Sequence, residues 1–121
     1  FAVQRYVFVS DDPIERRFAA EQVRNVARMA GNLRLQQPAM DGAHLQRPAL
    51  DNEPSLDDIE CGALIGTAAE VSERIVDEAG VLSLTHMSCF MRLADMPHDM
   101  AMRSIELFGR EVIPAVHQQI S

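Results

Sequence analysis

The chain has 121 residues, and because 47% of them are hydrophobic it is long enough for one domain with a buried core. Its 18 acidic residues outnumber its 11 basic residues, and the net charge of −7 argues against the basic face that general nucleic-acid binding requires. Every basic residue is an arginine, which excludes lysine chemistry such as a Schiff base, and no apolar run approaches the roughly 18 residues of a membrane helix.

The first 30 residues predict a strand followed by a helix. The stretch FAVQRYVFVS alternates and is rich in β-formers, and its apolar second half is typical of a strand buried on both faces. Asp11 or Asp12 can cap the helix that follows, and Pro13 suits its first position. We expect this helix to run to about Ala30 and to stop at the Gly-Asn pair that comes next.

The segment from Leu33 to Glu60 shows no clear hydrophobic period. It carries three prolines, with glycine, glutamine, asparagine and aspartate between them. A loop of this length in a compact domain is usually functional or mobile, whereas its composition is equally typical of a plain linker. Asp57, Asp58 and Glu60 form an acidic cluster, which we expect to be solvated.

The remaining sequence predicts a short strand, a helix, a second strand and a final helix. Cys61 to Ile65 is a short apolar run, and Thr67 with Glu70 forms a capping box that opens a helix. We expect this helix to end at the Ala-Gly pair at 79–80 and the stretch VLSLTHMSCF to be a strand. The last helix has apolar residues every three or four positions, and Pro114 is expected to kink or end it.

Helices between strands predict βα units and a parallel sheet, so the expected fold class is α/β. Two full strands and one short run cannot form a parallel sheet that is covered on both faces and protected at both edges. A closed α/β barrel needs eight strands and typically about 250 residues. We therefore expect either a piece of a larger fold or a chain whose partner supplies the missing strands.

The cysteines and histidines lack the spacing of a disulfide framework or a metal site. Cys61 and Cys89 stand far apart, as expected for a protein of the reducing cytoplasm. The histidines show no ligand spacing such as H-x-x-x-H, so no metal site is predicted. They are His44, His86, His98 and His117.

Three stretches resemble the C-terminal end of the bacterial luciferase-like flavin monooxygenases. ALIGTAAEVSERIVDEAG is similar to the family's "GTP-E-V-A-E-R" helix start, although Ala68 stands where the family often has proline. MPHDMAMRSIELFGREVIPAV is similar to its final helix, with the pattern "mP…S-x-x-L-F-x-x-x-V-x-P", and YVFVSDDPIERR is similar to its penultimate barrel strand and the helix after it. The resemblance covers nearly the whole chain except 33–60. The matching positions are Gly66, Thr67, Glu70, Val71, Glu73, Arg74, Met96, Pro97, Ser104, Leu107, Phe108, Val112 and Pro114.

The resemblance implies the C-terminal βα units of a TIM-type (β/α)8 barrel, incomplete in this chain. In that scheme residues 1–32 are a strand plus helix, 33–60 an irregular excursion that acts as a lid, and 61–121 the last helix-strand-helix units. The implied activity is that of a monooxygenase that uses reduced FMN, or alternatively F420, and molecular oxygen on a small organic substrate. The implied partners are a flavin reductase and either the remainder of the barrel or further copies of the chain, and this chain alone is expected to be inactive.

Two other interpretations stay open. The chain can be a non-catalytic truncated relative that acts as an oligomerisation or partner-binding α/β module through its exposed sheet edge. It can also be a small α/β domain whose likeness to the family is accidental. Neither nucleic acid nor a membrane is an expected partner in any of these cases.

Barrel enzymes place their active site at the carboxyl ends of the strands. The candidates for a substrate or flavin pocket are therefore Thr85, His86, Met87, Ser88, Cys89 and Phe90. Strand alternation puts the first, third and fifth of these on one face, and Leu82 and Leu84 share the other face. This favours Thr85, Met87 and Cys89 as lumen residues, although the sequence is also compatible with the opposite face. Cys89 is expected to be a small buried hydrophobe rather than a reactive thiol, and no catalytic residue is identified.

Weaker candidates lie elsewhere along the chain. Gly66 and Thr67 open a helix and could bind a phosphate, but a capping threonine explains them as well and is the favoured role. In the lid interpretation, Arg34 or Arg47 closes onto an anionic ligand. Two further candidates at predicted strand ends are Ser10–Asp12 and Arg92.

Overall fold

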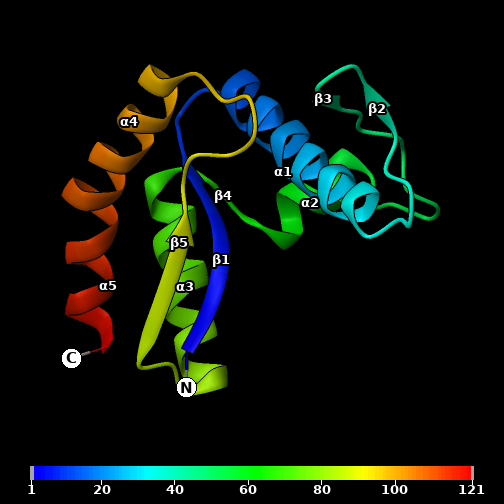
Figure 1. Ribbon diagram of the computed structural model, residues 1–121. Helices are drawn as coiled ribbons and strands as arrows, with labels where there is room; N and C mark the ends of the chain where they lie inside the picture. Colours follow the sequence, from blue (N-terminus) through cyan, green and yellow to red (C-terminus); the bar gives the residue numbers. More distant parts are fainter. Residues whose placement is uncertain (1, 121) are drawn as a thin grey trace.

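The computed structural model describes residues 2–120, which form a small parallel sheet with helices on both faces (Figure 1). The strands are β1 (Ala2–Val9), β2 (Met40–Asp41), β3 (His44–Leu45), β4 (Leu64–Gly66) and β5 (His86–Phe90). The helices are α1 (Pro13–Leu33), α2 (Leu56–Gly62), α3 (Ala68–Leu82), α4 (His98–Leu107), the π-helix η1 (Phe108–Val112) and α5 (Ile113–Ile120). The predicted α/β class with a parallel sheet is confirmed. Among the described residues no helix has the length and apolarity to cross a membrane.

The central strand of the sheet is β1, and the strand order is β4-β1-β5. The second half of β1 pairs with β4, with Val7 opposite Leu64, and its first half pairs with β5, with Tyr6 opposite Phe90. Successive strands of a (β/α)8 barrel lie side by side in chain order, which would put β4 in the middle. The described chain therefore forms an open sheet rather than an arc of a barrel in its usual order.

Alternate residues of β1 contribute to two separate cores. Val7 and Val9 pack with side chains of α3, η1 and α5. Phe8 packs with side chains of α1, α2 and the loop that follows β5. Because the side chains of a strand alternate, the two cores lie on opposite faces of the sheet. Helices on both faces and this strand order make the arrangement doubly wound, so its ligand site is also expected at the carboxyl ends of the strands.

Helix α1 begins as predicted and ends one turn later than expected. Asp12 caps it, with its carboxylate accepting from the Ile14 amide at 2.9 Å. The helix continues through Gly31 to Leu33. A Cβ atom on Gly31 would lie 2.6 Å from a methyl group of Leu50, so this glycine permits the close approach of the following segment rather than ending the helix.

The segment 33–60 is tied to α1 and is not the plain linker that its composition allowed. It contains the short hairpin β2–β3, turned at Gly42 with φ +61°, and the helix α2. The buried side chain of Asn32 holds both ends of the hairpin: its amide nitrogen donates to Ala39 O and Gln46 O at 2.9 Å each, and its oxygen accepts from the Ala39 amide at 2.8 Å. Helix α2 takes up Cys61, which was expected in the strand.

The ion pair between Arg28 and Glu53 is expected to make the free energy of unfolding depend on pH in the acidic range. The hydrogen bonds from Arg28 lower the pKa of Glu53 from 4.5 to about 2. Because the pKa is lower in the folded state, this contribution is complete above pH 4.5 and disappears as the pH falls towards 2. In urea unfolding between pH 2 and 6, Glu53→Gln should lose less stability on acidification than the natural chain. The exposed Glu73→Gln is the control, and an equal change for both variants would contradict the assignment.

Helix α3 is longer and β5 shorter than the sequence pattern predicted. The helix passes through Gly80 to Leu82 and ends at Ser83, which adopts the left-handed conformation with φ 53°. The Leu84 amide then donates to Ala79 O at 3.2 Å and closes the turn. Strand β5 therefore begins only at His86.

The last helix runs through its proline by means of a π-turn. Pro114 has no amide hydrogen, and its ring would collide with the carbonyl four residues earlier in a regular α-helix. The Ile113 amide instead donates to Phe108 O, five residues back, which widens the helix before the proline. Pro114 was expected to kink or end the helix, but the helix widens before the proline and continues beyond it.

Candidate functional site at the carboxyl edge of the sheet

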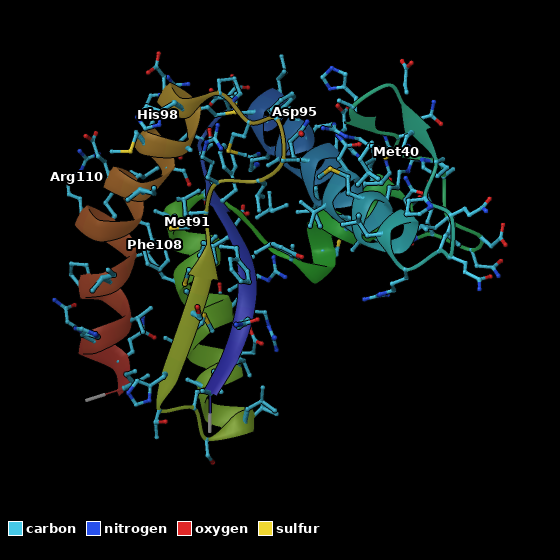
Figure 2. The ribbon with its side chains drawn as sticks, in the orientation of Figure 1. Met40, Met91, Asp95, His98, Phe108 and Arg110 are labelled. Atoms are coloured by element: carbon cyan, nitrogen blue, oxygen red, sulfur yellow. The ribbon has the colours of Figure 1, made fainter. Side chains whose placement is uncertain are left out.

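The carboxyl ends of β1 and β4 meet beside the amino end of α1. The Ser10 amide donates to Gly66 O at 3.0 Å, which joins the two strand ends. A hollow of about 350 Å³ opens between this edge and α4. Its polar lining residues are Ser10, Asp11, Glu15, Arg103, Ser104, Glu106 and Arg110. Figure 2 shows Arg110 and His98 on the helix that borders this edge.

A chain of polar side chains connects three elements at this hollow. Ser10 Oγ donates to Glu15 Oε1 at 2.8 Å and accepts from the Asp12 amide at 3.1 Å. The other oxygen of Glu15 accepts from Arg103 of α4 at 2.7 Å. This arrangement presents a hydroxyl, a carboxylate and a guanidinium together. It can bind and orient a polar group, and it forms a hydrogen-bonded path between the end of β1 and α4.

The buried serine of α4 fixes the end of β1. The Val9 amide donates to Ser104 Oγ at 2.9 Å, and only 2% of Val9 and 1% of Ser104 is exposed. Strand β5 pairs with β1 only as far as Tyr6, so no strand within residues 2–120 reaches Val9 on this side. Ser104 supplies the acceptor that a buried amide requires.

The expected face of β5 was wrong. Met87 and Cys89 pack against the core beneath α3, η1 and α5, so they face the helices. His86, Ser88 and Phe90 lie on the other face and are exposed, and the ring of Phe90 lies 5.9 Å from that of Tyr6. The predicted face was wrong because Leu82 belongs to α3 and Leu84 to the turn after it. Neither residue lies in the strand, so their positions do not indicate which face of β5 is apolar.

Four of the six β5 candidates do come together, but in a different place. An apolar hollow of about 360 Å³ between β5, α3 and α5 is lined by Thr85, His86, Met87 and Cys89. His86 Nδ1 lies 2.9 Å from Thr85 Oγ1. Both residues stand at the amino end of β5 rather than at the carboxyl end that was expected. Ser88 and Phe90 lie outside this hollow.

The two thiols are expected to differ strongly in reactivity. Cys61 is exposed on α2, whereas burial raises the pKa of the half-buried Cys89 thiol. Because the thiolate is the reactive form, Cys89 should react more slowly than Cys61. Iodoacetamide labelling at pH 8 followed by peptide mass spectrometry measures both rates in one sample. Equal rates, or faster labelling of Cys89, would contradict the structural role of Cys89.

Gly66 and Thr67 take part in helix capping. Thr67 Oγ1 accepts from the Glu70 amide at 3.3 Å, and Glu70 Oε2 accepts from the Thr67 amide at 3.4 Å, so the predicted capping box is confirmed. A Cβ atom on Gly66 would lie 2.6 Å from the same carboxylate oxygen of Glu70. The glycine therefore leaves room for the capping carboxylate, and phosphate binding at this turn stays a prediction.

The two arginines proposed for a lid differ in their contacts. Arg47 forms a bidentate ion pair with Asp95, in which Nη2 lies 2.8 Å from Oδ1. The hydrogen bonds from Arg47 lower the pKa of Asp95. The Asp95 amide also donates to Gln22 Oε1 of α1 at 3.0 Å. The segment 33–60 is thereby joined to the loop after β5. Arg34 is exposed at the end of α1 and forms no ion pair among residues 2–120.

The acidic cluster is only partly solvated. Arg17 of α1 pairs with Asp57 and, at 3.3 Å, with Glu60, while Asp58 is exposed in the first turn of α2. Arg92 is exposed in the loop after β5. Within the part of the chain that the structure describes, no group of three metal-binding side chains comes together.

Sequence reasoning missed the residues that organise the carboxyl edge. Glu15 is compatible with an ordinary acidic residue in the first turn of a helix, and Ser104 entered the sequence analysis only as a motif position. Arg103 gave no signal, because its partner Glu15 lies 88 positions earlier. The serine at position 104 did carry a usable signal, since it is a polar residue among the buried positions of an amphipathic helix.

Comparison with known proteins gives one distant relative and no family. No family model matches the chain. The chain is similar to the uncharacterized protein y4vJ of Sinorhizobium fredii strain NGR234, with 27% identity over 117 residues. The match covers 96% of this chain but 33% of that protein. The chain therefore spans about a third of the length of this relative.

Proposed function

We propose that the chain is the C-terminal portion of a luciferase-like flavin-dependent monooxygenase that uses reduced flavin and oxygen on a small organic substrate. The observation that carries this proposal is the place of the motif residues. Thr67 and Glu70 stand at the carboxyl end of β4, and Ser104 holds the carboxyl end of β1. Three of the residues that carry the resemblance thus lie at the edge where both barrel and doubly wound enzymes bind ligands.

The side chains at this edge fit part of a flavin site, with FMN as the first choice and F420 as the alternative. A bound reduced flavin supplies the oxygen chemistry, and the protein binds and orients it and excludes water. Arg110 lines the hollow and has no ion pair within residues 2–120, so it would hold a phosphate. Ser10 and Arg103 would orient polar groups of flavin or substrate, and the exposed ring of Phe90 beside the partly buried Tyr6 offers an aromatic surface.

The length of the relative is compatible with a complete barrel. Its 117 matched residues are 33% of its length, which gives about 350 residues, inside the range of about 200 to more than 400 for (β/α)8 barrels. The hollow of about 350 Å³ is near the lower limit of about 300 Å³ for ligand pockets. The proposal therefore assigns most of the flavin contacts to further strands outside these 121 residues.

A complete barrel requires β4 to move between β1 and β5, and this change is measurable. Gln4 and Ser88 face each other across β1 and β5 in the open sheet. With Cys61→Ser and Cys89→Ala in the background, Gln4→Cys with Ser88→Cys should form a disulfide in the 121-residue chain. In a longer form with barrel order the strands would stand two spacings apart, about 9–10 Å, and the link should not form. A disulfide in a longer, flavin-binding form would contradict barrel order.

Flavin binding tests the proposed chemistry directly. Reduced FMN and reduced F420 are titrated anaerobically into the longest form of the protein that the coding region gives, and binding is followed by absorbance. We expect one of them to bind and Arg110→Ala to weaken it, while Arg24→Ala on α1, which removes an arginine that does not line the hollow, serves as the control. Absence of binding by both flavins, or equal effects of the two variants, would count against the assignment of this edge as a flavin site.

A second candidate function is a partner-binding α/β module without catalysis. Large apolar side chains are exposed around the sheet, including Val81 at 83% and Phe90 at 46%. Exposed apolar groups beside open strand edges are typical of interaction surfaces. A chain that binds a protein partner and neither flavin would favour this function over the first.

A further inference from the structure

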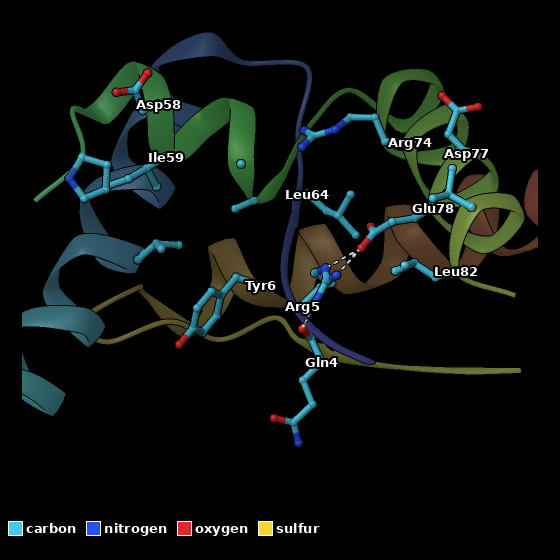
Figure 3. A pocket seen from close by; sticks show the side chains of 15 residues that line it. Gln4, Arg5, Tyr6, Asp58, Ile59, Leu64, Arg74, Asp77, Glu78 and Leu82 are labelled. Carbon is cyan, nitrogen blue, oxygen red and sulfur yellow. Dashed lines mark hydrogen bonds and ion pairs between the residues drawn. The ribbon is translucent and has the colours of Figure 1, made fainter. Parts of the chain in front are cut away.

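A groove runs along the free edge of β1, in the half of the strand that β4 does not reach (Figure 3). Strand β4 pairs only with Val7–Val9. Along Ala2–Tyr6, this side of β1 has no neighbouring strand among residues 2–120. The groove has a volume of about 870 Å³ and lies between α2 on one side and the last turns of α3 on the other.

The main chain of β1 presents hydrogen-bonding groups to this groove. The Ser10 amide points towards β4, where it donates to Gly66 O. Residues two positions apart in a strand point the same way, so Gln4 and Tyr6 face the groove with their main-chain groups. Gln4 O accepts from Arg5 Nη1 at 2.9 Å and retains a second lone pair. Such an edge is a ready template for a further strand.

The walls of the groove are apolar where an added strand would place its side chains. Val81 and Leu82 of α3 are 83% and 36% exposed and line one wall, and Ile59 of α2 lines the other. In strand addition, main-chain hydrogen bonds provide the affinity and pockets for alternate side chains provide the selectivity. The groove offers both, because its walls flank the two faces of the missing strand.

The charge that is left uncompensated in the groove is negative. Arg5 neutralises Glu78, with Nε 2.6 Å from Oε1, as Figure 3 shows. Arg74 donates to the backbone carbonyl of Cys61 at 2.5 Å and keeps its positive charge, so the excess in the groove is one negative charge. Asp77, on the α3 wall, is exposed and has no ion pair in the described chain, and the same holds for Asp58 on the other side. A basic side chain on an incoming strand would complement these carboxylates.

We infer that this groove binds an extended segment of a second polypeptide, in which apolar and basic side chains alternate, as an added strand beside Ala2–Tyr6. The inference rests on the second candidate function, the partner-binding module, because in a complete barrel a further strand of the same protein would take this edge. Neither flavin nor oxygen is used in its test, so absence of peptide binding would not count against flavin binding.

The test uses the 121-residue chain and a fluorescein-labelled hexapeptide, Val-Lys-Val-Lys-Val-Lys, with fluorescence anisotropy as the readout. We expect saturable binding. The comparison peptide has the same sequence with alternate backbone amides methylated, which keeps its charge but removes the donors for strand pairing. It should not bind, and equal binding of the two peptides would overturn the inference.

Two variants place the binding on this edge. Asp77→Lys should raise the Kd about two- to fivefold, the usual size of an exposed charge effect, whereas Glu111→Lys, an equal charge change on exposed η1, should leave it unchanged. Gln4→Pro removes an amide that faces the groove and should abolish binding while circular dichroism confirms folding. Equal effects of the two charge changes would overturn the inference. A dimer of the chain would also overturn the inference if Gln4→Pro disrupts it and the peptide does not displace it. In that case the edge of β1 would bind a second copy of the chain.

Discussion

Replacing Ser104 by alanine is expected to lower the free energy of unfolding by about 1–3 kcal/mol, because it leaves a buried donor unpaired. The donor is the Val9 amide, which reaches Ser104 Oγ at 2.9 Å and has no strand beside it on that side in the described part of the chain. Water cannot replace the hydroxyl easily, since both residues are almost completely buried. Urea unfolding followed by circular dichroism measures the change.

Ser72 provides a matched control for this substitution. It is also a buried serine in a helix, with 5% exposure, but its hydroxyl donates to Ala68 O of its own helix at 2.7 Å. That carbonyl is a regular acceptor within the helix, so Ser72→Ala removes a redundant bond and should cost little. If Ser72→Ala and Ser104→Ala destabilise the chain equally, the Ser104 hydroxyl does not have the special role assigned to it.

The elements that could be predicted from sequence are those whose signals are local. The cap at Asp12 and the capping box of Thr67 and Glu70 depend on residues within three positions of one another, and both are confirmed. The end of α3 was misplaced because Gly80 is a helix breaker by propensity only. Two further residues, Val81 and Leu82, continue the helix, and Ser83 closes it in a left-handed conformation that sequence gives little reason to expect.

The candidate site was less predictable because its contacts are long-range. Glu15 and Arg103 meet only through the packing of α4 against the end of β1. The residues next to each of them in sequence do not indicate that the two side chains form an ion pair. The prediction of which side chains of β5 face the helices depended on where the strand begins. The strand was predicted to begin too early, so its alternation was counted from residues that belong to α3. Met87 and Cys89 consequently changed from expected lumen residues to residues of the core beneath the helices.

Strand order is the feature that neither composition nor periodicity could supply. Alternating helices and strands predict a parallel sheet, but they are compatible with both barrel and doubly wound orders. The pairing of β1 with both β4 and β5 decides for the open order in this chain. Both orders still place the loops after β1, β4 and β5 on one edge, which is why the location of the proposed flavin site does not depend on the strand order.

Replacing Asn32 by alanine is expected to release the β2–β3 hairpin from α1. The substitution removes three hydrogen bonds to Ala39 and Gln46, each worth about 0.5–1.5 kcal/mol. Because Asn32 binds both ends of the hairpin, the segment between them should open as one unit while α3 stays folded. Native-state hydrogen exchange by mass spectrometry should show faster exchange at residues 39–46 and unchanged exchange in α3.

Asn25→Ala on the same helix separates this tether from a general effect on α1. Its amide nitrogen makes one longer hydrogen bond, 3.3 Å to Gln22 Oε1, and does not reach the hairpin. We expect this variant to leave exchange at 39–46 unchanged. Equal acceleration by both substitutions would mean that the hairpin follows the stability of α1 as a whole. An effect of Asn32→Ala alone would mean that one buried amide holds the β2–β3 hairpin against α1. The rest of the segment, which is proposed as a lid, would still be linked to the loop after β5 by the pair of Arg47 with Asp95.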